Sequence, residues 1–366
     1  MYISAVSGHR SAAMAIEKAI KLLSPETQVL SLNAFSYTNP ISEKIINRLY
    51  MGVVNKVPQI WNYLYDNPSV ARKLEKIKNT IHEFNSPKLK KLFDDFNPDV
   101  VICTQAFPCG MVADFKRIYD SNIKLIAVLT DYVPHAYWIY DSVDFYISAS
   151  DEVTKRLVQK GVALEKIKQF GIPFDHKFNE NIDRDSVLKK LDLETHLPTL
   201  LIMGGGHGLG PIKTIVKFLE QSKRDLQEIV VTGINTKLYN SLKSQIKRYN
   251  KRIVILGFVD NINELMSSSD IIITKPGGIT TAEALAKRIP MIIIRPLPGQ
   301  EASNTAYLVE KGAAVKIDDL NNINTVVEDL LSDFKKLNLI GESAGIIGRP
   351  NASLDIANHL LQLPNV

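Results

Sequence analysis

Short runs of β-branched and aliphatic residues recur along the chain, and segments with helical spacing separate most of them. In the first half the apolar runs lie at residues 2–6, 28–32, 99–103, 124–130 and 144–148, and the helical segments at residues 8–23, 69–96 and 151–160. Strands that alternate with helices in this way indicate a mostly parallel sheet with helices on both faces. The predicted fold class is therefore α/β.

The pattern is interrupted near residue 170 and then begins again. Gly171-Ile172-Pro173 breaks it, and residues 171–198 form a polar linker region without a strand. Six further apolar runs follow, at residues 199–203, 228–232, 252–256, 270–274, 291–294 and 313–317. A chain of 366 residues suits two domains. We predict two doubly wound, Rossmann-like domains that face each other across a cleft, over residues 1–170 and 199–350. The tail, 351–366, has apolar residues at helical spacing and is expected to pack back on the first domain.

Composition excludes several classes of protein. The two cysteines, Cys103 and Cys109, give no disulfide framework and a poor metal site, so buried thiols in a reducing cytosol are the better interpretation. No apolar run reaches the roughly 18 to 20 residues of a spanning helix, and no signal peptide pattern begins the chain. A net charge of +5 is too small to indicate nucleic acid, although a basic patch could meet an anionic surface.

Two glycine-rich turns follow strands of the second domain. They are GGGHGLG at residues 204–210 and PGG at residues 276–278, and each precedes a predicted helix. Neither fits the dinucleotide fingerprint or the P-loop. Residues without a Cβ expose backbone N–H groups beside an electropositive helix N-terminus, which suits an anion. A single glycine-rich sequence of this kind more commonly forms a tight turn without binding a ligand. Two at the carboxyl ends of strands in one domain favour a nucleoside diphosphate between them.

Other polar residues near these turns have two interpretations each. Glu283 could complete a capping box with Thr280, or its carboxylate could bind the hydroxyls of a ribose. Gln300, Glu301 and Asn304 could bind the hydroxyls of a sugar, or belong to a solvated loop and a helix cap.

The stretch ITKPGGITTAEALAKRIPMIIIRPLPGQEASNTAYLVEKGAA closely resembles the matching region of the diacylglycerol glycosyltransferases. These comprise the bacterial processive diacylglycerol glucosyltransferases and the plant monogalactosyldiacylglycerol synthases, relatives of the lipid-linked N-acetylglucosaminyltransferase of peptidoglycan synthesis. The resemblance covers most of the chain, with weaker matches at SGHRSAA, TDYVPHAYW, LIMGGGHGLG, LGFVDNINELM and RPNAS. One departure is the short first strand, which leads into Val6-Ser7-Gly8-His9 where the family has Gly-x-Gly-His.

The resemblance implies a GT-B fold whose C-terminal domain holds a UDP-sugar. The implied donor contacts are the backbone of Phe258 and Val259 for uracil, Glu283 for ribose, Gly206, His207, Gly278, Ile279 and Thr280 for the diphosphate, and Gln300, Glu301 and Asn304 for the sugar. On the acceptor side it implies His9 as general base, with Asp131, His135 and Trp138 near the acceptor. A histidine suits this task because its ordinary pKa of about 6.5 lies near operating pH, although from the residues alone His9 is more simply a helix-cap histidine.

The function implied is inverting transfer of a hexose, from UDP-glucose or UDP-galactose, to diacylglycerol or glycosyl-diacylglycerol. We expect no cofactor and no metal, because Asp183-Arg184-Asp185 matches a metal-binding Asp-x-Asp only in its letters and is better explained as acids that start a helix. The alternatives are a UDP-sugar epimerase or hydrolase of the same fold and, less favoured, a non-catalytic UDP-sugar-binding protein.

Residues 37–66 interleave tyrosines and a tryptophan with lysines and an arginine, as membrane interfaces do. A buried helix of the first domain explains the amphipathic pattern equally well. A lipid acceptor favours the interface. We therefore expect a cytoplasmic enzyme that binds peripherally to the inner face of the membrane, aided by anionic lipid.

Overall fold

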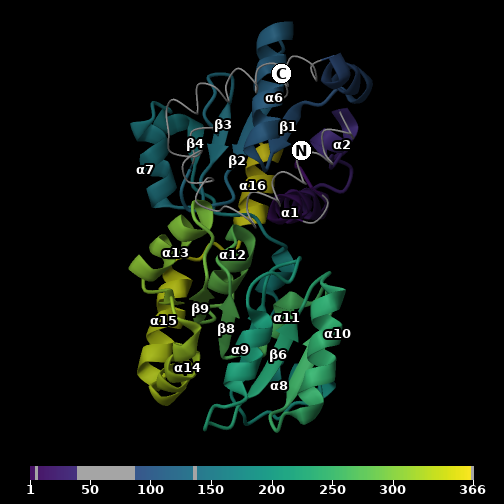
Figure 1. Ribbon diagram of the computed structural model, residues 1–366. Coiled ribbons are helices and arrows are strands. Elements are labelled where there is room, and N and C mark those ends of the chain that lie inside the picture. Colours follow the sequence, from purple (N-terminus) through teal and green to yellow (C-terminus); the bar gives the residue numbers. More distant parts are fainter. Residues whose placement is uncertain (5–6, 39–86, 135–137, 364–366) are drawn as a thin grey trace. The chain divides into compact units, whose positions relative to one another are not determined.

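The computed structural model describes residues 1–4, 7–38, 87–134 and 138–363 (Figure 1). They form two compact units, each built around one parallel sheet. Unit 1 comprises residues 1–176, 297–303 and 351–366, and unit 2 comprises residues 177–296 and 304–350. Within the described residues, no helix has the length and apolar character that crossing a membrane requires.

Unit 1 contains a four-stranded sheet in the order β1-β2-β3-β4, with every pair parallel. Its strands are β1 (Val100–Cys103), β2 (Lys124–Val128), β3 (Phe145–Ile147) and β4 (Ile167–Lys168). Its helices are α1 (Gly8–Leu23), α2 (Ala34–Thr38), a helix at residues 87–96, α6 (Ala106–Tyr119), α7 (Asp151–Gln159), the short 3₁₀ turn Leu164–Lys166 and α16 (Ala352–Leu361). The predicted segment 69–96 is thus described only over its last part.

In the part of the chain that the structure describes, the predicted strands at residues 2–6 and 28–32 are represented by a single parallel bridge between Tyr2 and Asn33. Tyr2 N–H donates to the Leu32 carbonyl at 3.0 Å, and on the other side Thr104 N–H donates to the Met1 carbonyl at 3.1 Å. The pairing stops early because Ser4 has a φ of +70°, which leaves the extended conformation that a strand needs. Expecting a full strand at residues 28–32 was wrong, whereas the last two residues of the predicted strand 2–6 lie outside the described residues.

Helices α1 and α16 pack together on one face of this sheet. Their apolar residues form one buried cluster with β2 and β3, whose members are Ile16, Ala19, Ile20, Ile126, Val128, Ile147, Ile356, Ala357 and Leu360. The buried Ser353 hydroxyl donates to the Phe174 carbonyl at 2.6 Å and fixes the start of α16. The C-terminal tail is therefore part of the core of unit 1. Cys103 and Cys109 are buried and form no disulfide, as predicted.

Unit 2 contains a six-stranded parallel sheet in the order β10-β9-β8-β5-β6-β7. Its strands are β5 (Thr199–Met203), β6 (Gln227–Val231), β7 (Ile253–Leu256), β8 (Ile271–Thr274), β9 (Met291–Ile294) and β10 (Ala314–Ile317). Its helices are α8 (Arg184–Lys190), α9 (Ile212–Leu219), α10 (Thr236–Gln245), α11 (Ile262–Ser267), α12 (Gly278–Ala286), α14 (Ile323–Ser332), α15 (Phe334–Ile347) and most of α13 (Gln300–Glu310), whose first residues belong to unit 1.

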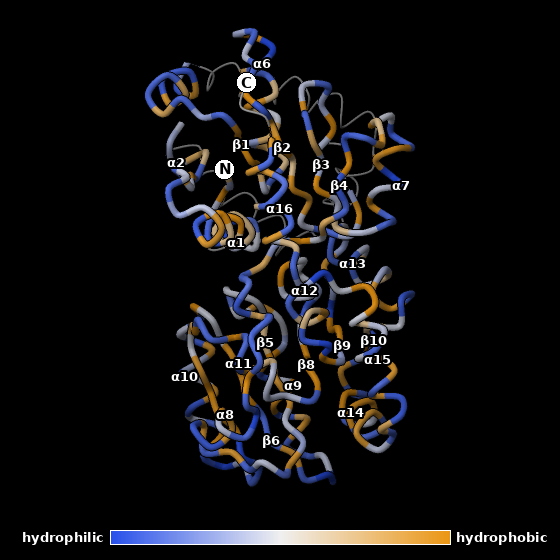
Figure 2. Tube along the Cα trace, turned by 180° about the vertical axis from the view of Figure 1, so that it is seen from behind, coloured by the Kyte–Doolittle hydropathy of each residue, from blue (hydrophilic) through white to orange (hydrophobic). Residues whose placement is uncertain are grey.

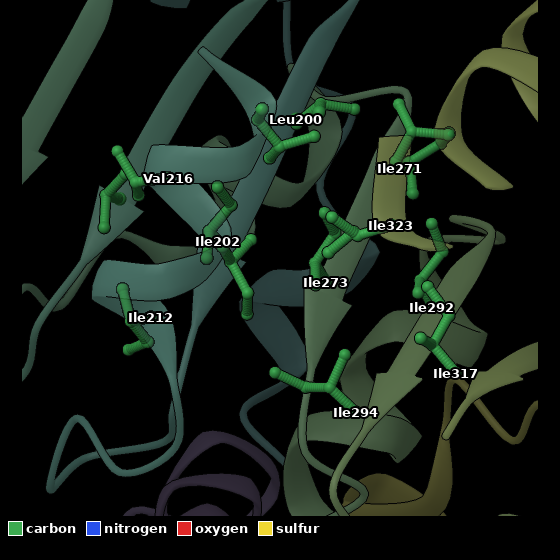
Figure 3. Close-up of a cluster of buried hydrophobic side chains, with 14 of the residues drawn as sticks. Leu200, Ile202, Ile212, Val216, Ile271, Ile273, Ile292, Ile294, Ile317 and Ile323 are labelled. Carbon is green, nitrogen blue, oxygen red and sulfur yellow. The ribbon is translucent and has the colours of Figure 1, made fainter. Parts of the chain in front are cut away.

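Isoleucine-rich strands build the core of unit 2. Every residue of β8 and β9 is buried, and Figure 2 shows β8 as a hydrophobic run. Strands buried on both faces read as continuous apolar runs rather than alternating ones. On one face, Ile202, Ile273 and Ile294 meet apolar side chains of α9 and α14, including Ile212 and Ile323 (Figure 3).

The strand order of unit 2 reverses at the pair β5–β8. Sequence neighbours β6 and β7 lie on one side of β5, while β9 and β10 lie beyond β8. Met203 is opposite Thr274, the last residue of each strand. The turns 204–210 and 276–278 therefore begin at the same edge of the sheet, at its switch point. Open α/β sheets bind ligands at this place.

Glu228 makes the stability of unit 2 depend on pH. Its side chain is fully buried in β6, and neither carboxyl oxygen has a hydrogen-bond partner among the described residues. Burial raises its pKa well above the usual range; Glu220 adds to this increase, and Lys251 opposes it. The unfolded chain loses the proton near pH 4.3, so at higher pH unfolding releases a proton and stability falls as pH rises.

We expect Glu228→Gln to raise the free energy of unfolding, and to do so more at pH 8 than at pH 5. The pH slope should change by up to about 1.4 kcal/mol per pH unit. Denaturant unfolding at several pH values measures this, and Glu310→Gln, at an exposed position on α13, is the matched control. If the free energy of unfolding had the same pH slope in the wild type and in Glu228→Gln, the pH dependence would not come from Glu228.

Candidate functional site

The first glycine-rich turn needs glycine for its own folding. A Cβ at Gly204 would lie 1.9 Å from the Leu209 carbonyl oxygen, and one at Gly208 would lie 2.0 Å from that of Thr232. Gly208 also has a φ of +57°. The turn is closed by hydrogen bonds from Gly208 N–H to the Gly205 carbonyl and from Leu209 N–H to the Gly204 carbonyl. These hydrogen bonds keep the loop compact and close to the end of β5.

Gly277 in the second turn is different, because nothing in the described structure requires glycine there. A Cβ would meet no atom within 4 Å, and its φ of −68° is open to any residue. The absent side chain leaves clearance above the turn. Clearance of this kind is what the backbone needs to approach a bound group.

Helices α9 and α12, which follow the two turns, start without a side-chain cap. Their N-cap residues are Pro211 and Gly277, and neither makes a side-chain capping bond. In the same unit, Asn235 caps α10 by accepting from Leu238 N–H at 3.0 Å. The first N–H groups of a helix need a partner and attract negative charge. An anion at the switch point would meet both needs.

The structure rules out the capping-box interpretation of Glu283. Helix α12 begins at Gly278, so Thr280 already lies inside the helix and cannot be its N-cap. Glu283 lies one turn further along and is half-buried. Its carboxylate is therefore not part of a capping box at the start of the helix, and its role as a ribose ligand stays a prediction.

The remaining predicted donor residues of unit 2 are arranged in two ways. The two turns and the first turn of α12 contain Gly206, His207, Gly278, Ile279 and Thr280. The strand β7 ends at the same edge of the sheet and is followed by Phe258 and Val259. The Phe258 side chain is 67% exposed, so an apolar ring is open to a flat ligand.

Asn304 differs from its prediction as a sugar contact. Its side chain is completely buried, and its Nδ2 donates to the Pro276 carbonyl at 3.1 Å. It holds the Pro276-Gly277-Gly278 turn in place from below. Its contribution to a ligand site is therefore to position the turn.

In unit 1, His9 is the second residue of α1 and lies beyond the carboxyl ends of β1 and β2. Its Nδ1 is 2.8 Å from the Thr104 carbonyl oxygen and 3.1 Å from the Thr130 hydroxyl. A carbonyl only accepts, so Nδ1 carries the proton and Nε2 carries the lone pair. The Thr104 hydroxyl donates to the His9 carbonyl at 2.8 Å and holds the backbone as well. This histidine is oriented as a base.

Burial of the ring lowers the pKa of His9, while the Asp131 carboxylate and the bond to Thr104 partly oppose that shift. The neutral imidazole is therefore favoured near pH 7. The residue as a whole is only half-buried, so part of its surface stays open. A neutral, oriented and accessible imidazole is what a general base requires.

Residues predicted for the acceptor and for the donor sugar meet in unit 1. Gln300 Nε2 donates to Asp131 Oδ2 at 3.0 Å, and Glu301 Oε2 accepts from Leu297 N–H at 2.9 Å. Trp138 is only 3% exposed, so its ring lies in the core rather than on an open surface. The predicted acceptor residue His135 lies outside the described residues, as does most of the segment 37–66.

Sequence reasoning missed Thr104 and Thr130, the two residues that orient His9. Thr104 directly follows the apolar run 99–103, and Thr130 is the polar last residue of the run 124–130; those positions were the available signal. By contrast, Asp183 caps α8 as predicted, because its carboxylate accepts from Asp185 N–H at 3.1 Å.

A cavity of about 940 Å³ in unit 1 lies mainly at the other edge of its sheet. Residues 27–32, residues 97–100 at the start of β1 and residues 121–124 at the start of β2 line much of it. Ligands of open α/β sheets bind at the carboxyl ends of strands. We therefore place the candidate site at His9 and not in this cavity.

Both halves of the chain match known protein families. Residues 9–174 match the family described as monogalactosyldiacylglycerol (MGDG) synthase, and residues 199–344 match the glycosyltransferase family 28 C-terminal domain. The processive diacylglycerol beta-glucosyltransferase of Bacillus licheniformis is 31% identical over 358 residues, covering 97% of this chain and 92% of that protein. Its Bacillus cereus counterpart is 33% identical over 356 residues, covering 97% and 90%.

Solved structures of other proteins also match nearly the whole chain. MurG of Acinetobacter baumannii has a TM-score of 0.65 at 15% identity and covers 99% of both chains. Staphylococcus aureus MnaA with UDP also has a TM-score of 0.65, at 16% identity, covering 98% of this chain and 95% of the other. At such low identity these likenesses show the fold alone, and they confirm the predicted GT-B-like class. The full-length relatives go further: the chain belongs to the glycosyltransferase family of the processive diacylglycerol beta-glucosyltransferases and monogalactosyldiacylglycerol synthases.

Proposed function

We propose that this protein transfers glucose from UDP-glucose to the free hydroxyl of diacylglycerol, and then to the glucosyl-diacylglycerol so formed. The observation that carries the donor half is the switch point of unit 2, where two glycine-rich turns lead into two helices without side-chain caps. The acceptor half and the choice of glucose rest on the relatives named diacylglycerol beta-glucosyltransferase.

In this proposal the diphosphate of the donor lies over the two turns of unit 2. Backbone N–H groups from Gly206, His207 and Gly278 to Thr280 meet its oxygens, and the Glu283 carboxylate accepts from the ribose hydroxyls. The exposed Phe258 ring and the neighbouring backbone take the uracil. Gln300 and Glu301 serve the sugar hydroxyls, and Asn304 supports the turn through the Pro276 carbonyl.

The reaction follows from these assignments. His9 Nε2 removes the proton of the acceptor hydroxyl, whose oxygen attacks the anomeric carbon as the bond to UDP breaks. The electron pair of that bond stays with the departing diphosphate, which helix N-termini and preorganised N–H groups stabilise. UDP-glucose has an α linkage, so a beta-glucoside product requires a single inverting displacement.

The lipid acceptor makes peripheral binding to a membrane surface part of the proposal. Residues 37–66 carry the required chemistry in their sequence, with aromatic side chains between cations, and the net charge is +5. Anionic lipid on the cytoplasmic leaflet attracts such segments.

The deciding experiment incubates the protein with UDP-glucose or UDP-galactose, diacylglycerol in anionic liposomes and a metal chelator. We expect glucosyl-diacylglycerol, and on longer incubation lipids with more than one glucose, separated by chromatography and identified by mass. A galactolipid would correct the sugar. Free sugar or an epimerised UDP-sugar without a glycolipid would replace the proposal by hydrolase or epimerase chemistry, and UDP-sugar binding without any product would leave a non-catalytic binder.

His9 and Asp131 should control how activity depends on pH. Because the pKa of His9 is lowered, kcat/KM should fall on acidification only below pH of about 6.5. Asp131→Asn removes the charge that opposes this shift, so the acidic limb should move to lower pH. The amide oxygen of asparagine can still accept from Gln300, which makes this variant conservative.

His9→Ala should lower kcat by about 100- to 10,000-fold, a typical contribution of a general base. Unchanged activity in this variant would remove His9 from the mechanism. An acidic limb that stays in place in Asp131→Asn would show that another group causes it.

Gly277→Ala should separate donor binding from folding. The added methyl group has open space and an ordinary φ, so the free energy of unfolding should change by no more than about 1 kcal/mol, whereas the KM for UDP-glucose should rise at least about tenfold. The contrasting variant is Gly208→Ala, whose Cβ would meet the Thr232 carbonyl at 2.0 Å and should destabilise the fold itself. A Gly277→Ala enzyme with unchanged KM would show that this clearance serves no ligand.

A further inference from the structure

Lys275 is a positively charged residue at the switch point that the site described above does not include. It is the first residue after β8 and directly precedes the second glycine-rich turn. Its Cε lies 3.9 Å from the position that a Cβ of Gly205 would take. The side chain therefore reaches from the end of β8 across to the turn that follows β5.

The backbone on both sides of Lys275 is held in place. Thr274 is paired in register with Met203, and the Pro276 carbonyl accepts from the buried Asn304 side chain at 3.1 Å. The Lys275 carbonyl itself accepts from Gly277 N–H at 3.0 Å. With the backbone fixed, the direction in which the side chain leaves the strand is fixed too. Gly205, with a φ of +67° and no side chain, leaves room for the lysine stem.

We propose that the Lys275 ammonium group binds the diphosphate of the donor and stabilises it as it leaves. This inference rests on the proposed function, because it requires a nucleoside diphosphate at the switch point. Two helix N-termini together supply about one positive charge, whereas the diphosphate of a nucleotide sugar carries about two negative charges and gains a third on departure. A lysine point charge beside the turns reduces this deficit.

A purely structural role, in which the stem only packs on Gly205, predicts a different result. Packing would affect the fold and every ligand of unit 2 alike. Charge pairing would affect only ligands that carry the diphosphate, and its effect would weaken as salt screens the interaction. Binding of UDP can therefore be compared with binding of uridine, which has the same base and ribose without phosphates.

The test measures the affinities of the full-length protein for UDP and for uridine by calorimetry, in the wild type, Lys275→Gln and Lys275→Arg. Lys275→Gln should weaken UDP binding at least about tenfold and uridine binding less than about twofold. Lys275→Arg, which keeps the charge, should recover most of the affinity, and higher salt should narrow the difference. Lys243→Gln, an exposed lysine on α10, is the control for a general loss of charge.

Equal weakening of UDP and uridine, or no weakening of either, would overturn the assignment of Lys275. A wild-type protein that binds no UDP would overturn it together with the donor site. The glycolipid assay stands apart from this measurement. If no glycolipid forms but Lys275→Gln still weakens UDP selectively, then the lipid acceptor is wrong and the diphosphate contact stands.

Discussion

The parallel pairing of β5 with β8 is the contact on which the candidate donor site depends. It connects strands that are far apart in the sequence and ends both at the same level, at Met203 and Thr274. The two glycine-rich turns, the starts of α9 and α12, and Lys275 all take their positions from this register. A shift of one residue would move the second turn along the sheet and reverse the faces of the β8 side chains, which are buried on both sides. The apolar core therefore fixes the geometry of the polar site.

The glycines at this edge have two separate physical causes. Gly204 and Gly208 are needed because the loop after β5 folds against its own backbone and against Thr232, which keeps the loop compact whether or not a ligand is bound. Gly277 has neither a close neighbour nor an unusual φ. Under the proposed function, the missing side chain of Gly277 gives the diphosphate clearance above the turn. The sequence shows both as the same letter, so the distinction between a tight turn and clearance for a ligand comes from the structure.

Much of the fold could be predicted because its signals are local. Helices α1 and α16 have clear apolar spacing, and the strands of unit 2 are short isoleucine-rich runs bounded by glycine or polar residues. Predictions failed where the outcome depends on distant contacts or single dihedral angles. The φ of Ser4 ends the N-terminal pairing, the start of α12 at Gly278 excludes Thr280 as a cap, and the buried bond to Pro276 turns Asn304 inward. Thr104 and Thr130 are found only once the fold brings them to His9.

The charged groups of the two units respond to pH in different ways, and under the proposed mechanism this places the pH dependence of the reaction in unit 1. Helix N-termini and backbone N–H groups do not titrate, so the diphosphate contacts proposed for them are constant across the working range. His9 is the group that changes. Burial favours its neutral form, and Asp131 limits how far the pKa falls, which preserves some basicity in the imidazole. If the pKa of His9 were too low, the imidazole would be a weak base, and if it were too high, the imidazole would be protonated. Burial and the Asp131 charge act in opposite directions, and this balance suits proton abstraction near neutral pH.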